Sequence, residues 1–118
     1  MAGLVKPNID EVFEMIDAAI KHDPSPTKGK EGVYQFHLQG DDGDGGTYQM
    51  IIDEDGPRAI MGEEKEAQVT LTIRGDEFRD MVAGSLNPTA AFMGGKLKIK
   101  GNMGLALKLQ TVLNSFSF

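Results

Sequence analysis

Hydrophobic residues change their spacing several times along the chain, and these changes are the feature that most limits its fold. Residues 8–22 place apolar side chains at helical spacing, residues 33–74 alternate apolar and polar side chains, and helical spacing returns from residue 76. Alternation with a period of two is typical of strands that bury one face. We therefore predict an α+β fold, in which helices cover the apolar face of a sheet.

The alternating region divides into four strands joined by short links. We expect strands at residues 33–39, 47–53, 57–62 and 68–74, a fifth strand at 96–100, and helices at 8–22, 76–83, 87–93 and 103–115. Because hairpins are the simplest way to join consecutive strands, the first four predict an antiparallel meander with one wet face. The length of 118 residues predicts a single domain over residues 1–118.

The composition excludes several classes of function. The chain has no cysteine, which excludes disulfides, zinc–thiolate sites and thiol catalysis. Its net charge of −6 argues against nonspecific nucleic-acid binding and against a broadly basic membrane-binding face. No apolar run approaches the roughly 18–20 residues that span a bilayer. Residues 1–7 lack the apolar core of a secretory signal, and residues 116–118 do not resemble a peroxisomal tripeptide, so we expect a cytoplasmic location.

The last expected helix is more apolar than one contact surface requires. A stripe along it is widened by Met103 and Leu107 on its flank. The stripe itself consists of Leu105, Leu109, Val112, Leu113 and Phe116. Two interpretations fit this pattern: the helix is sunk in a core, or it forms the wall of an apolar cavity. The seven methionines fit both, because methionine fills gaps in cores and also lines surfaces that accept varied ligands.

No group of residues has the spacing of a catalytic or metal site. The two histidines, His22 and His37, lie far apart in the sequence, and both are expected at the surface. A calcium loop that began at Asp53 would have Glu64 as its last ligand, but Arg58 stands where such a loop requires glycine. We therefore expect no enzymatic activity, no metal and no cofactor.

Three lysines of the expected fifth strand, Lys96, Lys98 and Lys100, allow two interpretations. In the first interpretation, the three lysines contact an anionic headgroup, such as a phosphate or a coenzyme A tail. Alternatively, they form the solvated face of an edge strand and guard it against aggregation.

Residues 92–110, FMGGKLKIKGNMGLALKLQ, closely resemble the signature of the sterol carrier protein type 2 family. Residues 87–91 resemble the short helix that precedes that signature, and the order of elements from Asn8 onward is similar as well. The resemblance implies a five-stranded, mostly antiparallel sheet with helices on one face that enclose an apolar tunnel. It also implies noncatalytic binding of fatty acids, fatty acyl-CoA, sterols or phospholipids, and movement of these lipids between membranes.

A lipid ligand of this kind would lie between the sheet and the helices that cover it. The residues expected to contact it are Ile16, Ile20, Phe36, Met50, Ile52, Leu71, Met81, Phe92, Leu105, Leu109, Gln110, Val112, Leu113 and Phe116. Gln110 is the polar residue expected near a headgroup. The expected partners are this lipid and, transiently, a membrane, with no nucleic acid, for a monomer or weak homodimer. The alternative is an accessory or dimerisation module of the same fold with a vestigial cavity.

Overall fold

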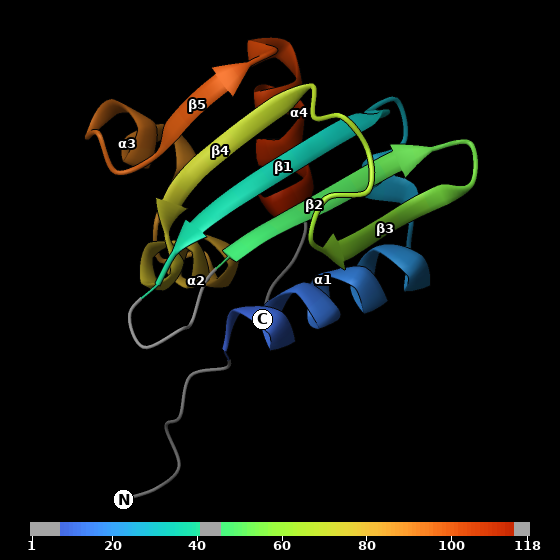
Figure 1. Cartoon of the computed structure of the whole chain (residues 1–118), viewed down its shortest axis with the longest axis horizontal. Coiled ribbons are helices and arrows are strands. Elements are labelled where there is room, and N and C mark those ends of the chain that lie inside the picture. The colour runs from blue at the N-terminus through green and yellow to red at the C-terminus, as the bar shows by residue number, and fades with distance from the viewer. Residues whose placement is uncertain (1–7, 41–45, 115–118) are drawn as a thin grey trace, which may run out of the picture.

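The computed structural model describes residues 8–40 and 46–114, which form a five-stranded sheet covered by helices (Figure 1). In chain order the elements are α1 (Ile9–His22), a 3-10 turn (Ser25–Thr27), β1 (Gly32–Gln39), β2 (Gly46–Asp53), β3 (Gly56–Met61), β4 (Val69–Arg74), α2 (Gly75–Ala83), α3 (Pro88–Met93), β5 (Lys98–Gly101) and α4 (Met103–Asn114). This arrangement confirms the predicted α+β class and the mostly antiparallel five-stranded sheet.

The strand order is β3-β2-β1-β4-β5, and β1 with β4 is the one parallel pair among the four pairings of the described strands. The predicted four-strand meander is therefore wrong at its last step. The link at residues 62–68 is not a hairpin, because it carries the chain across the sheet to the other side of β1 (Figure 1). Three strand spacings amount to about 14 Å, and seven extended residues reach about 23 Å, so the link is long enough to cross.

A buried glutamine on β2 holds this crossing link against the sheet. Gln49 Oε1 accepts hydrogen bonds from the backbone N–H groups of Glu64 and Lys65 at 2.9 and 3.2 Å. Its Nε2 donates to the Lys65 carbonyl at 2.7 Å and to Gln35 Oε1 at 2.8 Å. The face expected to be wet is thus partly covered, and a fully buried glutamine is stable there because every polar atom of its side chain has a partner.

The apolar face of the sheet is covered by helices, and the core beneath α1 and α2 is filled by aromatic rings. α1 packs beside β3, α2 beside β1 and β4, and α4 across β1, β4 and β5 (Figure 1). Phe13 stacks on Tyr48 and Phe78, with ring centroids 4.4 and 5.4 Å apart, and meets Phe36 edge-on at 5.3 Å. All four rings are buried, so this half of the interior is packed by side chains of the protein itself.

Candidate functional site

The other half of the interior contains an apolar cavity of about 140 Å³ between α3, β5 and α4. Leu71 of β4, Ile99 of β5 and Leu97 immediately before β5 line it from the side of the sheet. Met81 of α2 and Phe92 of α3 line it from the helices, and the rest of the wall comes mainly from α4. The cavity therefore forms where the aromatic cluster ends and the C-terminal elements cover the sheet.

Two asparagine caps fix the helices on either side of the cavity. Asn87 Oδ1 accepts hydrogen bonds from the N–H groups of Thr89 and Ala90, at 2.8 and 3.2 Å, and starts α3. Asn102 Oδ1 accepts the N–H of Leu105 at 3.1 Å and starts α4. Both caps satisfy backbone donors that the first helical turn leaves without partners.

The turn after α3 folds the chain back beneath that helix. The N–H groups of Lys96 and Leu97 both bond to the Ala91 carbonyl, at 2.9 and 3.0 Å. This places Leu97 in the cavity lining with only 3% of its surface exposed. Because these two N–H groups are engaged in the turn, the strand begins at Lys98 and not at residue 96 as expected.

α4 presents two different apolar surfaces, one buried and one open. Leu109 and Leu113 are buried and face the cavity from beneath, whereas Met103 and Leu107 line the same cavity while 47% and 66% of their surface stays exposed. The excess apolar width of this helix is therefore explained by its position as a cavity wall, which is the second of the two interpretations given above.

Two polar side chains face the cavity, and they bond to each other. Thr89 Oγ1 on α3 donates to Gln110 Oε1 on α4 at 3.0 Å. No charged side chain is among the described residues that line the cavity. A bound molecule would therefore meet a nearly uniform apolar wall, with one amide and one hydroxyl at the junction of the two helices.

The residues predicted to contact a ligand separate into three groups. Leu71, Met81, Phe92, Leu109, Gln110 and Leu113 line the cavity. Ile16, Ile20, Phe36, Met50, Ile52, Leu105 and Val112 are buried in the core and do not line this cavity. Phe116 lies outside the described residues. Ligand contact by these fourteen residues stays a prediction.

Seven further residues line the cavity that the sequence reasoning did not select as ligand contacts. They are Pro88, Thr89, Leu97, Ile99, Met103, Ala106 and Leu107. The sequence did indicate a role for Met103 and Leu107, because these apolar residues lie beyond the stripe that the last helix buries. Leu97 and Ile99 also carried a signal, because they alternate with lysines in an edge strand and need cover on one face.

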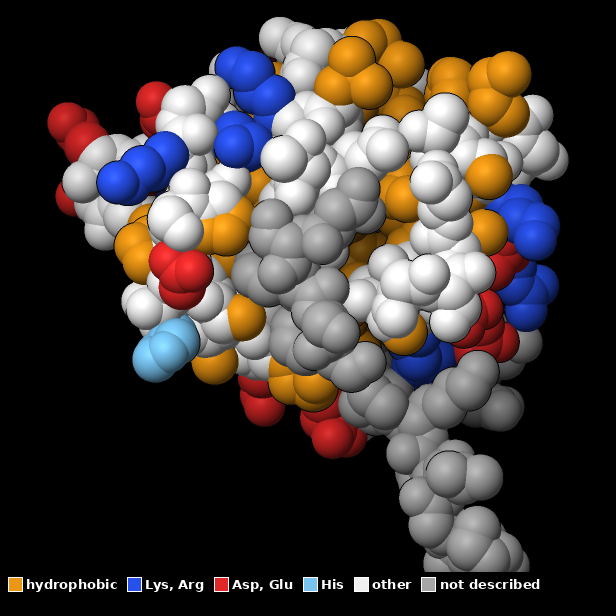
Figure 2. Space-filling view, turned by 180° about the vertical axis from the view of Figure 1, so that it is seen from behind, with side chains coloured by type: hydrophobic (Ala, Val, Ile, Leu, Met, Phe, Trp, Pro, Cys, Tyr) orange, Lys and Arg blue, Asp and Glu red, His pale blue; other side chains and the backbone are white. Residues whose placement is uncertain are grey.

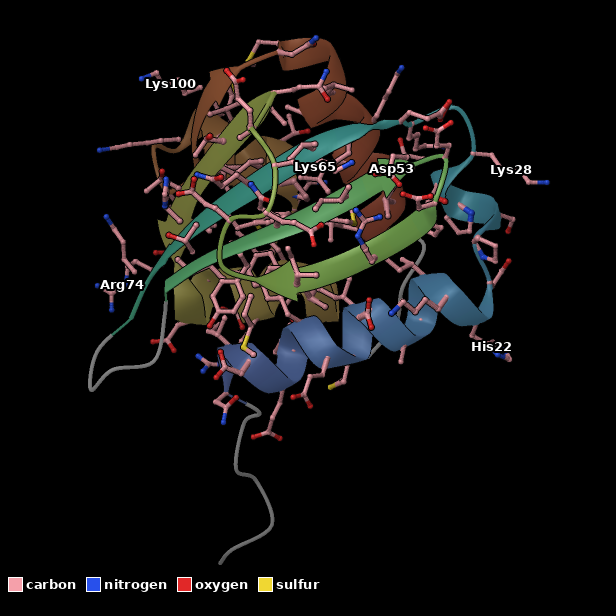
Figure 3. The ribbon with its side chains drawn as sticks, turned by 45° about the vertical axis from the view of Figure 1, so that its right-hand side comes forward. His22, Lys28, Asp53, Lys65, Arg74 and Lys100 are labelled. Carbon is pink, nitrogen blue, oxygen red and sulfur yellow. The ribbon has the colours of Figure 1, made fainter. Side chains whose placement is uncertain are left out.

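The lysines of β5 point away from the cavity. In the β4–β5 ladder, Ile99 lies opposite Leu71, and both line the cavity, whereas Lys98 and Lys100 lie opposite threonines of β4. Alternate residues of a strand face opposite sides of the sheet, so these two lysines occupy the other face. β5 is an edge strand and Lys100 lies at the periphery (Figure 3), which agrees with the edge-strand interpretation.

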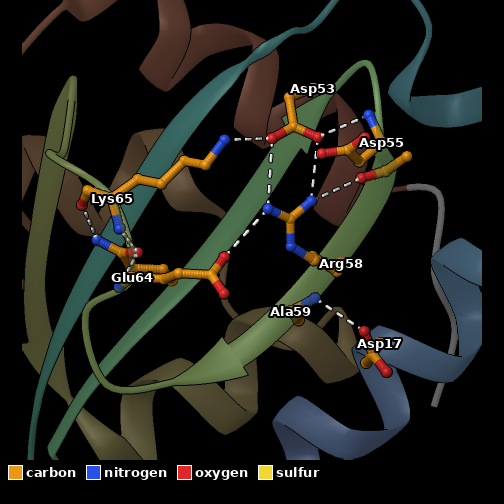
Figure 4. A network of polar contacts seen from close by, with 9 residues as sticks. Asp17, Asp53, Asp55, Arg58, Ala59, Glu64 and Lys65 are labelled. Atoms are coloured by element: carbon orange, nitrogen blue, oxygen red, sulfur yellow. Dashed lines mark hydrogen bonds and ion pairs between the residues drawn. The ribbon is translucent and has the colours of Figure 1, made fainter.

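A separate charged cluster on the other face of the sheet is a structural clamp. Asp53 bonds to Arg58 at 3.0 Å and to Lys65 at 2.7 Å, and Arg58 also reaches Glu64 at 3.1 Å (Figure 4). The hydrogen bonds from Arg58, and then from Lys65, hold the pKa of Asp53 well below its ordinary value. The same contacts raise the pKa values of Arg58 and Lys65. The cluster ties β2, β3 and the crossing link together.

Neither histidine belongs to a chemical site in the described part of the chain. His22 is exposed at the end of α1, as expected (Figure 3). His37 is half-buried, contrary to expectation, because its ring lies within 3.3 Å of Gln35 Nε2 and 3.1 Å of Thr47 Oγ1. Within residues 8–40 and 46–114 no three acidic, histidine or cysteine side chains come close enough to share a metal ion. No helix of the described chain has the length and apolar character needed to cross a bilayer.

Comparison with known proteins assigns this architecture to a family. The chain matches the SCP-2 sterol transfer family over residues 13–114. The chain belongs to this family. The resemblance seen in the C-terminal signature is thereby confirmed, and the SCP-2 match covers both the aromatic half of the interior and the cavity.

Solved structures of SCP-2 domains share the fold along nearly the whole chain. The sterol carrier protein domain 2 of Helicoverpa armigera is 28% identical with a TM-score of 0.79, and the match covers 98% of this chain and 93% of that one. Sterol carrier protein 2 of Aedes aegypti, solved in complex with palmitate, is 21% identical with a TM-score of 0.73, over 96% and 100% of the two chains. The Aedes likeness shows the fold alone.

Curated relatives carry this SCP-2 region as part of a longer protein. Hydroxysteroid dehydrogenase-like protein 2 of Bos taurus is 39% identical over 110 residues, which cover 92% of this chain and 25% of that protein. The chain thus spans about a quarter of the length of such relatives.

Proposed function

We propose that this SCP-2 domain is a noncatalytic lipid carrier, which holds an alkyl chain in the cavity between α3, β5 and α4 and moves lipids between membranes. The observation that carries the proposal is the cavity of about 140 Å³ with its apolar lining. Burial of hydrocarbon needs no directional partner, so such a site accepts fatty acids, acyl-CoA, sterols or phospholipid chains with little discrimination.

The size of the cavity limits what it holds without rearrangement. An engineered apolar cavity of about 150 Å³ holds one benzene molecule, so a cavity of 140 Å³ holds about six carbons. Burial at about 0.8 kcal/mol for each methylene then contributes about 5 kcal/mol before the cost of association. A longer chain has to extend over Phe92, Met103 and Leu107 at the open side or widen the cavity, so affinity should rise with chain length and then level off.

The known relatives support a lipid ligand. The Aedes aegypti protein with the same fold was solved with palmitate, a single saturated chain. We propose the same class of ligand here, with a membrane as transient partner and the protein acting in the cytoplasm as a monomer or weak homodimer.

A second candidate function has its own observation. Because the relatives named above are about four times as long as this match, an SCP-2 region can also serve as an accessory module of a larger protein. In that case the cavity would be vestigial and would bind no lipid.

Titration with a fluorescent fatty acid, followed by displacement with unlabelled lipids, separates the two candidates. Saturable binding, displaced more strongly by longer chains, is expected for a carrier, and native mass spectrometry of the purified protein should show a co-purified lipid. Transfer between donor and acceptor vesicles tests the movement step. Absence of saturable binding and of a co-purified lipid would refute the carrier and support the accessory module.

A further inference from the structure

The charges of this chain are divided between its two parts. Residues 1–80 contain all eighteen acidic residues and eight of the twelve basic residues, which gives a net charge of −10. Residues 81–118 contain four lysines and no acidic residue, which gives +4. The second part supplies α3, β5 and α4, the elements that surround the cavity. The net charge of −6 therefore hides a positively charged C-terminal part, in which Lys98 and Lys100 face away from the cavity and Lys96 and Lys108 belong to the remaining segments around it.

Exposed apolar side chains gather in the same region. Phe92, Met103 and Leu107 line the cavity with 41%, 47% and 66% of their surface exposed. Met93 follows Phe92 on α3, is 79% exposed, and does not line the cavity. Figure 2 shows hydrophobic side chains gathered along the upper part of the face that carries the helices. These four residues are here called the apolar rim: three of them line the cavity, and Met93 is the exposed neighbour of Phe92 on α3.

The lysines near the apolar rim have no carboxylate partner among the described residues. Lys96 follows the last turn of α3, and Lys108 follows Leu107 on α4; both are exposed. By contrast, Lys21, Arg58 and Lys65 each form an ion pair of 3.1 Å or less. Lysines without a protein counter-ion lie here beside exposed apolar side chains. This combination matches a lipid bilayer, whose interior is apolar and whose headgroups are negatively charged.

We propose that α3, β5 and α4 form the face by which the protein docks onto an anionic lipid bilayer, with the mouth of the cavity against the lipid. This inference rests on the proposed carrier function and names its partner. The apolar rim enters the boundary between headgroups and acyl chains, and Lys96 and Lys108 contact lipid phosphates.

The rest of the molecule helps to fix the orientation of this docking. Salt screens charges beyond about 8 Å at physiological ionic strength, so the bilayer interacts mainly with the face that touches it. The four acidic residues of α1, Asp10, Glu11, Glu14 and Asp17, would be repelled if that helix approached the anionic surface. A lipid that leaves the bilayer can then enter the cavity with little exposure to water.

Co-sedimentation of the full chain with vesicles tests the docking face. The vesicles are phosphatidylcholine alone, or phosphatidylcholine and phosphatidylglycerol in a three-to-one mixture, at low and high salt. We expect binding to the mixed vesicles that weakens at high salt. One lysine near an anionic surface contributes about five-fold in affinity, so the double variant Lys96→Gln/Lys108→Gln should bind about 30-fold more weakly.

Matched variants separate docking from a general effect of charge or folding. Lys21→Gln/Lys28→Gln makes the same charge change at exposed sites outside this face and should alter vesicle binding by less than about two-fold. Met93→Asp should abolish vesicle binding, whereas Met61→Asp, at a residue that is 59% exposed on β3, should not. All four variants should bind fluorescent fatty acid as the unchanged protein does, since none of these residues lines the cavity.

Three outcomes would overturn the docking face. Equal losses in the two double-lysine variants would mean that binding follows net charge. Fatty-acid binding without any binding to mixed vesicles would leave the carrier proposal standing and remove this one. Concentration-dependent dimerisation that is lost in Met93→Asp, without vesicle binding, would show that a second copy of the chain covers the apolar rim. Loss of fatty-acid binding with vesicle binding intact would instead refute the carrier function alone.

Discussion

Replacement of Ala106 by leucine should fill part of the cavity from the wall of α4. Ala106 lines the cavity and is 8% exposed, so three added carbons would project into a space that holds about six. Burial of these carbons at about 0.8 kcal/mol each should raise the free energy of unfolding of the lipid-free protein by about 2 kcal/mol. For a domain of this size, that corresponds to an increase in Tm of about 10 °C.

The same substitution should weaken lipid binding, because the new side chain occupies the space of the ligand. Loss of about three buried carbons from a bound chain should raise the Kd for a fatty acid about 30-fold. Urea denaturation of the delipidated protein gives the first quantity, and displacement of a fluorescent fatty acid gives the second. Ala83→Leu, at an exposed alanine in α2, makes the same chemical change away from the cavity and should leave the Kd unchanged.

The opposite signs of the two effects make the test decisive. A side chain forced into a filled core would lower stability by about 1–3 kcal/mol. If Ala106→Leu destabilised the protein and left the Kd for fatty acid unchanged, the cavity would not be the lipid site, and the reasoning from its volume would be refuted.

Three further substitutions test the fold around the site. Gly101→Ala should lower the free energy of unfolding by about 2–3 kcal/mol, because Gly101 has φ +108° and a Cβ there would lie 2.5 Å from the Gln68 carbonyl oxygen. An unchanged midpoint in urea denaturation would contradict this. Gln49→Leu should lower the free energy of unfolding by about 2–4 kcal/mol, because it removes the side chain that bonds to the crossing link. Amide hydrogen exchange should then accelerate at residues 64 and 65, and unaltered exchange would argue against a role of Gln49 in holding the link. Asp53→Asn should lower the stability of the protein at neutral pH, and the stability difference from the unchanged protein should shrink as the pH falls below about 4. The reason is that a carboxylate whose pKa is lowered in the folded state stabilises it only while the carboxylate is ionised. A stability difference that does not depend on pH would refute the role of the Asp53 charge.

The elements themselves could be predicted from the sequence because their signals are local. Asn8 caps α1 by accepting the N–H of Glu11 at 2.9 Å, and Asn87-Pro88 starts α3, as their positions before apolar periodic segments indicated. The parallel placement of β4 could not be predicted, because the link at 62–68 has no hairpin signal that distinguishes it from a crossing. The contacts that hold the crossing are long-range: Gln49 bonds to the link at residues fifteen and sixteen positions away in the sequence.

The cavity could be predicted only as one of two interpretations of the last helix, and not to its position in the interior. The apolar width of α4 fitted a helix sunk in a core as well as a cavity wall, and the structure places it at the cavity. Phe36 and Met50 also point inward, and a periodicity argument cannot distinguish an inward residue beside a void from one beside another side chain. Phe36 meets Phe13 and Phe78 at ring distances of 5.3 and 5.5 Å, so aromatic packing fills that half of the interior. The cavity remains where the covering side chains are aliphatic or small, such as Ala106.

The net charge of a chain predicts its surface charge only when acidic and basic residues are evenly distributed. In this chain all acidic residues lie within residues 1–80. The value of −6 argues against a broadly basic surface, but a bilayer interacts with one face at a time and within about 8 Å of it. What matters for docking is therefore the charge beside the apolar rim, where Lys96 and Lys108 are exposed and have no carboxylate partner among the described residues. If the carrier function holds, a lipid that fills the cavity also covers Phe92, Met103 and Leu107 in part, because these exposed residues line it. Loading should thus weaken the vesicle binding of the protein, and co-sedimentation with and without bound fatty acid measures this difference directly.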